Sequence, residues 1–114
     1  MTPQEFVSCI RREVLEQNLA LYHQNLNRSL SPANAQEVHW PRMAELYQSL
    51  NEEQRLQFIE GIRLVMVDTL SNVLGILDGS TLLEKHRDYF HLTYGEEPQK
   101  LNGELQDFFL SSET

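Results

Sequence analysis

Residues 51–79 read NEEQRLQFIEGIRLVMVDTLSNVLGILDG, and this stretch decides the fold. Its apolar residues recur every three or four positions, which is the spacing of one α-helical face. Asn51 and Gln54 have the types and the spacing of a capping box, and Gly79 can adopt the left-handed conformation that ends many helices. The stretch therefore predicts a central helix over about residues 52–78.

The apolar face of this central helix is wide. Phe58, Val65 and Ile76 extend it to more than half of the circumference. A helix with so wide an apolar surface is expected to be surrounded by other elements. We therefore expect five residues to be nearly fully buried: Ile59, Ile62, Met66, Leu70 and Val73.

The N-terminal residues predict another long helix. Thr2 and Glu5 suit a capping box, Pro3 suits the first helical position, and the apolar spacing continues to about Asn27. An apolar arc as wide as this one is typical of a helix with two neighbours. The arc divides into two faces, namely Phe6, Ile10, Val14 and Leu21 on one side and Leu15, Leu19, Tyr22 and Leu26 on the other.

The chain between the two long helices predicts shorter elements. Ser31-Pro32 could open a short helix that continues through Val38. Trp40-Pro41 should interrupt the chain, because the residue before a proline disfavours the α conformation. Apolar residues at helical spacing then predict a helix from about Pro41 to Leu50.

The C-terminal third changes in character. Residues 88–94 alternate between apolar and polar side chains, with Phe90, Leu92 and Tyr94 on one side, which is typical of a strand. Residues 95–98 have the composition of a turn, residues 99–101 could form a return strand, and Asn102 could cap a final helix. The expected fold is mainly α: a small helical bundle around a central long helix, with a short β-hairpin near the C-terminus and a final short helix. We expect one domain over residues 1–114.

Charge and composition limit the class of partner. The chain carries a formal net charge of −8, and its basic residues do not cluster, so it lacks the positive surface that binds nucleic acid. Cys9 is the only cysteine, which excludes an intramolecular disulfide. The longest apolar stretch, residues 62–77, contains charged and polar residues and is too short to cross a bilayer. We expect a cytoplasmic protein whose acidic surface serves solubility or attracts a basic partner protein.

Motifs of catalysis are missing from the sequence. The five glycines never form a phosphate-binding loop, and the serines lack the nucleophile elbow of hydrolases. The carboxylate pair Glu52-Glu53 is explained by the start of the central helix, and the pair Glu96-Glu97 falls in an expected turn. We therefore expect no enzyme activity and no cofactor.

The best candidate for a metal site is the segment that holds His86, Asp88 and His91, since imidazole and carboxylate groups bind zinc and iron. On a strand, His86 and Asp88 share one side while His91 faces the other. On a helix, the two histidines lie about 140° apart. Neither geometry brings the three side chains together, so we expect no bound metal.

Two surfaces are candidates for binding a protein. Gly61, Asp68 and Gly75 are spaced by seven on the central helix, where two glycines could let a partner helix, or a second copy of this chain, approach closely. The stripe could equally be a solvent-facing side on which glycine does no harm. The second candidate surface is expected to form a two-fold homodimer, with Asp68 off the axis, through the face of Leu15, Leu19, Tyr22 and Leu26.

These observations favour a non-catalytic protein-binding domain, for example an acidic inhibitor, an immunity-like protein or an accessory protein. The alternative is a helical ligand- or metal-binding domain that uses His86, Asp88 and His91.

Overall fold

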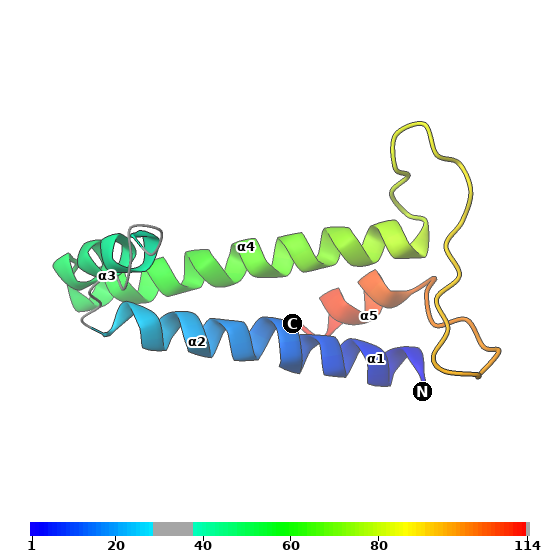
Figure 1. Ribbon diagram of the computed structural model, residues 1–114, viewed down its shortest axis with the longest axis horizontal. Helices are drawn as coiled ribbons and strands as arrows, with labels where there is room; N and C mark the ends of the chain where they lie inside the picture. The colour runs from blue at the N-terminus through cyan, green and yellow to red at the C-terminus, as the bar shows by residue number, and fades with distance from the viewer. Residues whose placement is uncertain (29–37, 114) are drawn as a thin grey trace.

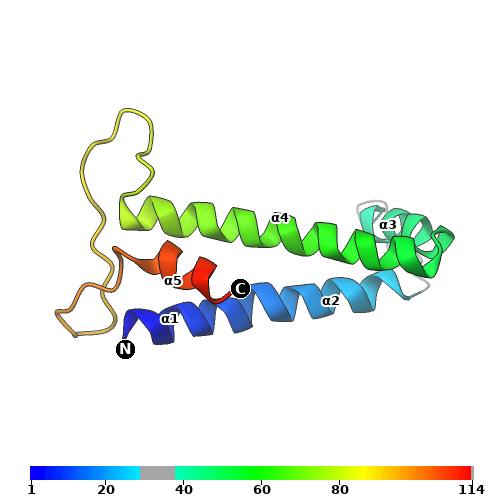
Figure 2. The same cartoon turned by 180° about the vertical axis from the view of Figure 1, so that it is seen from behind.

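The computed structural model describes residues 1–28 and 38–113. Their helical segments are α1 (Pro3–Ile10), the π-helix η1 (Arg11–Glu16), α2 (Gln17–Leu26), α3 (His39–Ser49), α4 (Glu52–Asp78) and α5 (Leu105–Ser111). The first three form one continuous rod, called the N-terminal rod below, which runs antiparallel to α4 (Figure 1). α3 lies at one end of this pair, and α5 lies against both long helices near the other end (Figure 1, and from behind in Figure 2). The prediction of a mainly helical fold is confirmed.

The N-terminal rod has the extent expected from the sequence, and Thr2 Oγ1 accepts the expected hydrogen bond from the Glu5 amide at 3.0 Å. Its π-helix was not expected. In an uninterrupted α-helix, Val7 and Leu15 would point about 80° apart, because eight residues make rather more than two turns. A π-turn holds about one residue more than an α-turn, so it rotates Leu15 back towards the side of Val7. Both side chains are consequently buried in the same core.

α3 begins earlier than the sequence analysis predicted. It starts at His39, so Trp40 and Pro41 lie inside its first turn and do not interrupt the chain. Proline is tolerated there because the first amides of a helix have no partner within the helix. The Trp40 ring packs edge-on against Tyr22 of α2, at 4.8 Å between ring centroids. The short helix expected over residues 31–38 lies outside the described residues, apart from Val38.

α4 has the bounds that its sequence predicts. The capping box between Asn51 and Gln54 is present, and Gly79 ends the helix with a φ of 86°. The core lies along the half of α4 that approaches this C-terminal end, where α4 meets the rod and α5. It consists of Val7, Leu15, Val67, Leu74, Leu105 and Phe109.

The expected burial of α4 is wrong. Ile59, Ile62, Met66 and Leu70 are only partly buried, and Val73 is 49% exposed. The buried residues of α4 lie along one stripe instead, because the rod and α5 cover only part of its circumference. The apolar arc of a helix shows which of its side chains can be buried. The number and position of the neighbouring helices determine which of these side chains are buried.

The expected β-hairpin near the C-terminus is also wrong, since none of the described residues forms a strand. Two contacts of the expected hairpin are present: the Glu97 amide donates to the Tyr94 carbonyl at 3.1 Å in the turn, and the Leu101 amide donates to the Leu92 carbonyl at 2.7 Å. The buried Asn102 side chain takes the place of a strand ladder. It accepts a hydrogen bond from the Leu92 amide at 2.8 Å and donates to the carbonyls of Phe90 and Leu77. This side chain ties the extended segment of residues 79–104 to the end of α4.

The molecule is elongated. Its radius of gyration is 17.9 Å, and its extents are 50 × 34 × 29 Å, whereas a compact domain of this length has a radius of about 13 Å. No helix among the described residues is both long and apolar enough to cross a membrane.

Candidate protein-binding face

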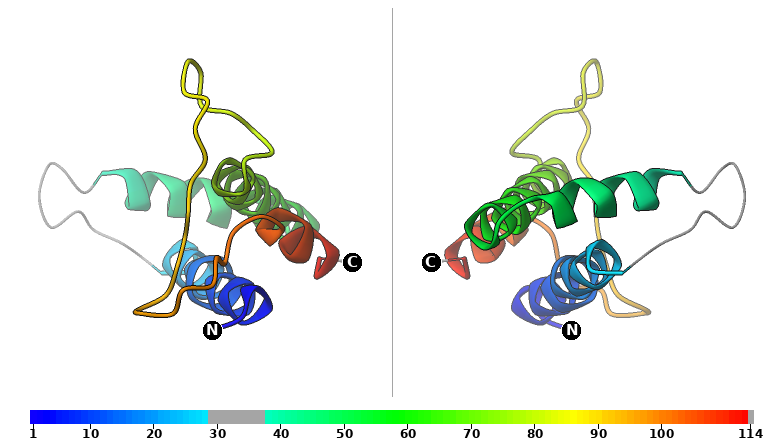
Figure 3. Two further views of the ribbon diagram at one scale, coloured as in Figure 1. Left: turned by 90° about the vertical axis from the view of Figure 1, so that its right-hand side faces the viewer. Right: turned by 90° about the vertical axis from the view of Figure 1, so that its left-hand side faces the viewer.

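One side of α4 is covered less than the other, with Val65, Thr69 and Val73 exposed between partly buried residues. Its buried residues, Val67, Ser71, Leu74 and Gly75, share one stripe under α5 and the rod. At 100° per residue, the opposite side of the helix carries Phe58, Ile62, Val65, Thr69, Val73 and Ile76. Viewed along the long axis, α5 lies on one side of the long helices, and α3 extends on the other (Figure 3). We call the less covered surface the open face and define it as Tyr22, Phe58, Ile62, Val65, Met66, Thr69, Val73 and Ile76.

The open face contains an apolar groove next to α2. The groove has a volume of about 510 Å³ and is lined by Tyr22, Gln57, Phe58, Gly61, Ile62, Val65 and Met66. Val65 is 64% exposed at its edge. None of the residues that define the open face carries a charge. The polar groups of the groove are the Gln57 amide and the Tyr22 hydroxyl, so a partner would contact mostly apolar side chains there.

α3 bounds the open face at the N-terminal end of α4. Arg55 holds α3 in place, because its Nε donates to the Tyr47 carbonyl at 3.2 Å and its Nη2 donates to the Gln48 carbonyl at 2.6 Å. The Tyr47 ring packs against Phe58 with 5.7 Å between ring centroids. α3 therefore forms a fixed wall beside the groove.

A second hollow lies at the C-terminal end of α4, where the extended segment leaves the helix. It has a volume of about 350 Å³ and is mostly apolar. Its lining residues are Ile76, Gly79, Thr81, Leu82, Leu83, His86, Asp88, Tyr89 and Phe90. Ile76 belongs to both surfaces, so the apolar surface runs along α4 from one hollow to the other. We call this second hollow the segment pocket.

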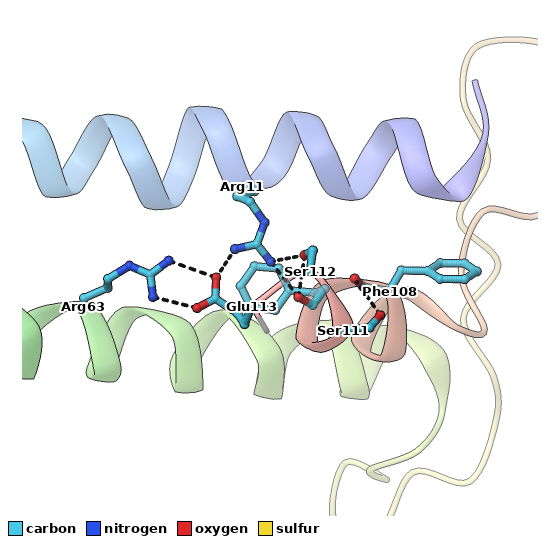
Figure 4. A network of polar contacts seen from close by, with 7 residues as sticks. Arg11, Arg63, Phe108, Ser111, Ser112 and Glu113 are labelled. Carbon is cyan, nitrogen blue, oxygen red and sulfur yellow. Dashed lines mark hydrogen bonds and ion pairs between the residues drawn. The ribbon is translucent and has the colours of Figure 1, made fainter.

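The opposite side of the two long helices is closed by α5. Figure 4 shows the polar network at its end, in which Glu113 lies between Arg11 of the rod and Arg63 of α4. Arg63 donates to the two Glu113 oxygens at 2.6 and 3.0 Å, and the Arg11 guanidinium lies 4.4 Å from the centre of the Phe109 ring. The hydrogen bonds from Arg63, together with those from Arg11, lower the pKa of the Glu113 carboxyl, although burial opposes the shift. This side of the molecule is therefore occupied by the chain itself.

The three residues of the expected glycine stripe have different surroundings in the structure. A Cβ atom added at Gly75 would lie 2.9 Å from Gln106 Nε2, so the close approach expected at this glycine is made by α5 of the same chain. Gln106 in turn donates to the Ser71 carbonyl at 3.0 Å. Gly61 has no such neighbour within 4 Å and lines the groove, and Asp68 is exposed outside the open face. Gly61 alone remains at a candidate binding surface.

The face of Leu15, Leu19, Tyr22 and Leu26 lies mostly inside the chain. Leu15 and Leu26 are fully buried, and Leu19 and Tyr22 are half-buried. Only Tyr22 of this set lines the groove. In this conformation, a partner could not reach the two buried leucines.

The candidate metal residues are not gathered into a metal site. His86 and Asp88 line the segment pocket, whereas His91 is exposed elsewhere on the segment. In residues 1–28 and 38–113, no group of three His, Cys, Asp or Glu side chains lies close enough to hold a metal ion. Cys9 is half-buried, and its Sγ atom lies 3.6 Å from Nη2 of Arg12.

The open face has a signal in the sequence. Phe58, Val65 and Ile76 extend the apolar arc of α4 beyond what one or two neighbouring helices can cover. From this excess the sequence predicts burial inside a bundle.

Comparisons with protein-family models, with curated proteins and with solved structures found no match.

Proposed function

We propose that this chain is a non-catalytic protein-binding domain that acts through the open face. Within this class, an inhibitor, an immunity-like protein and an accessory protein all work by surface complementarity. The observation that carries the proposal is the less covered apolar side of α4, which continues from the groove beside α3 to the segment pocket.

The exposure of this surface supports binding to a protein. Val65 and Val73 are 64% and 49% exposed, although each lies on the central helix of the molecule. Large contiguous apolar patches are rare on monomers and often mark an interface. The fixed position of α3 also favours binding, because a surface that is already formed costs less entropy to order.

Two kinds of protein partner fit the proposal. One is a protein with a basic rim, since charged residues outside the open face give the chain a net charge of −8 and would steer such a partner. The other is a second copy of this chain. Both would bury the open face, and neither requires a reaction or a cofactor.

Site-specific photo-crosslinking tests the proposal. A photoreactive amino acid is placed at position 65 in the open face, and the matched control carries it at position 64. Leu64 is adjacent on α4 and 61% exposed, but it points about 100° away. After illumination in cells, we expect a protein adduct at position 65 and much less at position 64. Equal yields at both positions, or no adduct at 65, would contradict the proposed binding face.

A ligand-binding domain is the second candidate function, and the segment pocket favours it. The pocket combines an apolar lining with His86 and Asp88, two of the three residues that the sequence suggested for ligand binding. Calorimetric titration with zinc tests this candidate. Binding of about one ion per chain, lost in His86→Ala, would favour it over the protein-binding function.

A further inference from the structure

We propose that the partner of the open face is a second copy of this chain, related to the first by a two-fold axis. This inference rests on the proposed function and names the partner. Two features of the described residues support it, namely the absence of charge on the open face and the positions of α3 and the segment pocket.

The exposed area exceeds that of a compact monomer. The chain exposes 8385 Å², whereas a folded monomer of 13.3 kDa exposes about 6,500 Å². The difference, about 1,900 Å², is more than twice the roughly 800 Å² that each partner buries in a standard protein interface. The exposed segment of residues 80–100 accounts for part of this difference, and the open face contributes the exposed side chains of Val65, Thr69 and Val73.

The chemistry of the open face suits self-association. A two-fold axis places the same patch of both copies in contact, so any charge near the axis would meet a charge of its own sign. Each copy of this chain carries −8, yet the open face consists of apolar side chains with the hydroxyl groups of Thr69 and Tyr22. Asp68, the acidic residue in the middle of α4, lies outside this row. A surface specialised for a basic protein would instead present carboxylates.

The two ends of the open face carry different features. α3 projects beside Phe58, and the segment pocket opens beside Ile76, which lies 18 residues or about 27 Å further along α4. A two-fold axis level with residue 67, midway between these two positions, brings α3 of each copy to the segment pocket of the other. α3 carries exposed apolar side chains, Met43 and Leu46, for that contact.

The resulting dimer consists of two layers of long helices packed face to face. Each copy contributes α4 and the N-terminal rod, and the two α3 helices close the ends. Val65 and Thr69 lie two residues on either side of the axis level and are buried by the second copy. Leu64, whose side chain points about 100° away from Val65, stays outside the contact.

Multi-angle light scattering of the full chain, at concentrations from a few to a few hundred micromolar, tests the proposal. We expect a mass of twice 13.3 kDa for the wild type. In Val65→Lys, an unpaired ammonium group would be buried, so the dissociation constant should rise by at least about 100-fold. In Leu64→Lys, the same charge is added at a similarly exposed position, and the constant should change by less than about threefold.

Disulfide formation provides a second measurement that does not depend on disrupting the protein. In a Cys9→Ser background, the double variant Val65→Cys and Thr69→Cys should give an oxidised dimer, because an axis level with residue 67 places residue 65 of one copy opposite residue 69 of the other. Leu64→Cys should remain a monomer under the same oxidation.

The outcomes separate this inference from the proposed function. A wild-type mass of 13.3 kDa at all concentrations, or a dimer that persists in Val65→Lys, overturns the two-fold contact. Equal loss of the dimer in Leu64→Lys also overturns it. If crosslinking at position 65 then captures a different protein, the binding function stands and only the identity of the partner is wrong. If position 65 captures nothing, the proposed function fails as well.

Discussion

At the scale of single residues, two buried or partly buried polar side chains organise the C-terminal third of the molecule. The Asp78 carboxylate at the end of α4 accepts hydrogen bonds from the amides of Gly103, Leu105 and Gln106, at 2.6, 3.0 and 2.8 Å. Asp78 thereby caps α5, the role that the sequence had assigned to Asn102. Asn102 is used instead to hold the extended segment. The residues that Asp78 and Asn102 contact lie far away in the sequence.

Glu113 makes the stability of the docked α5 dependent on pH. Its pKa is lowered in the folded protein, chiefly by the hydrogen bonds from Arg63. The ionised carboxylate therefore contributes fully to the free energy of unfolding above its pKa in the unfolded chain, about 4.3. This contribution is lost as the pH falls through the lower pKa of the folded protein. We expect Glu113→Gln to destabilise the protein by about 1–2 kcal/mol at pH 7. The difference from the wild type should shrink between about pH 5 and pH 3.

Urea unfolding across this pH range measures the effect. Glu45→Gln in α3 is the control, because it removes the same charge at an exposed helical position. A destabilisation by Glu113→Gln that stayed constant down to pH 3 would contradict the role of the ionised carboxylate.

At the scale of elements, α5 decides which side of α4 becomes core. Its two fully buried side chains, Leu105 and Phe109, fill the space between α4 and the rod, and Gly75 admits Gln106 against α4. No comparable element packs against the other side of α4 over residues 62–76 among those described. On the same helix, Leu74 is consequently buried under α5, whereas the neighbouring residue Val73 is exposed.

Truncation of α5 side chains measures how much this helix contributes. Phe109→Ala removes a fully buried ring and should cost about 3–5 kcal/mol of the free energy of unfolding. The control, Leu110→Ala, changes an exposed neighbour on the same helix and should cost less than about 1 kcal/mol. Chemical denaturation compares the two variants, and equal costs would mean that α5 is not part of the core.

The two glycines of α4 provide another matched pair. Gly61→Ala adds a methyl group where no other atom lies within 4 Å, so it should stabilise the protein by up to about 1 kcal/mol through helix propensity. Gly75→Ala gains the same propensity but must displace the Gln106 amide from Ser71. We expect the melting temperature of Gly61→Ala to exceed that of Gly75→Ala. The opposite order would show that α5 does not pack closely at Gly75.

At the scale of the whole molecule, the elongated shape leaves apolar surface exposed on one side of the long helices. Two helices in a layer, covered on one side only, leave a shape 50 Å long with much of its apolar surface in solvent. An elongated monomer of this kind is stabilised by any association that covers the other side, because binding to the folded state shifts the folding equilibrium.

Dimerisation should therefore make the stability depend on concentration. The Tm of the wild type should rise when the protein concentration increases about 100-fold, since more of the folded chain is then bound to a second copy. The Tm of Val65→Lys should stay constant, and that of Leu64→Lys should follow the wild type. Differential scanning calorimetry at the two concentrations makes the comparison. A Tm of the wild type that does not depend on concentration would contradict a dimer coupled to folding.

The sequence by itself determined the helices whose signals are local. The bounds of α4 follow from Asn51, Gln54 and Gly79, and the start of the rod follows from Thr2 and Pro3. Caps and periodicity act within a few residues, so they can be read without knowledge of the rest of the chain. The final short helix was also predicted, because its apolar spacing is local as well.

Only the tertiary structure decided which apolar surfaces are covered. The arc of α4 does not distinguish Leu74, which is buried under α5, from Val73, which is exposed. The alternation of residues 88–94 predicted a strand, yet a strand needs a ladder of backbone hydrogen bonds. This segment has one such bond across the turn, from the Leu101 amide to the Leu92 carbonyl, and the Asn102 side chain bonds to Phe90 and Leu92 beside it. Periodicity describes one segment, whereas burial and pairing depend on a second segment. The open face results from the same cause, because the described residues include no element that covers it fully.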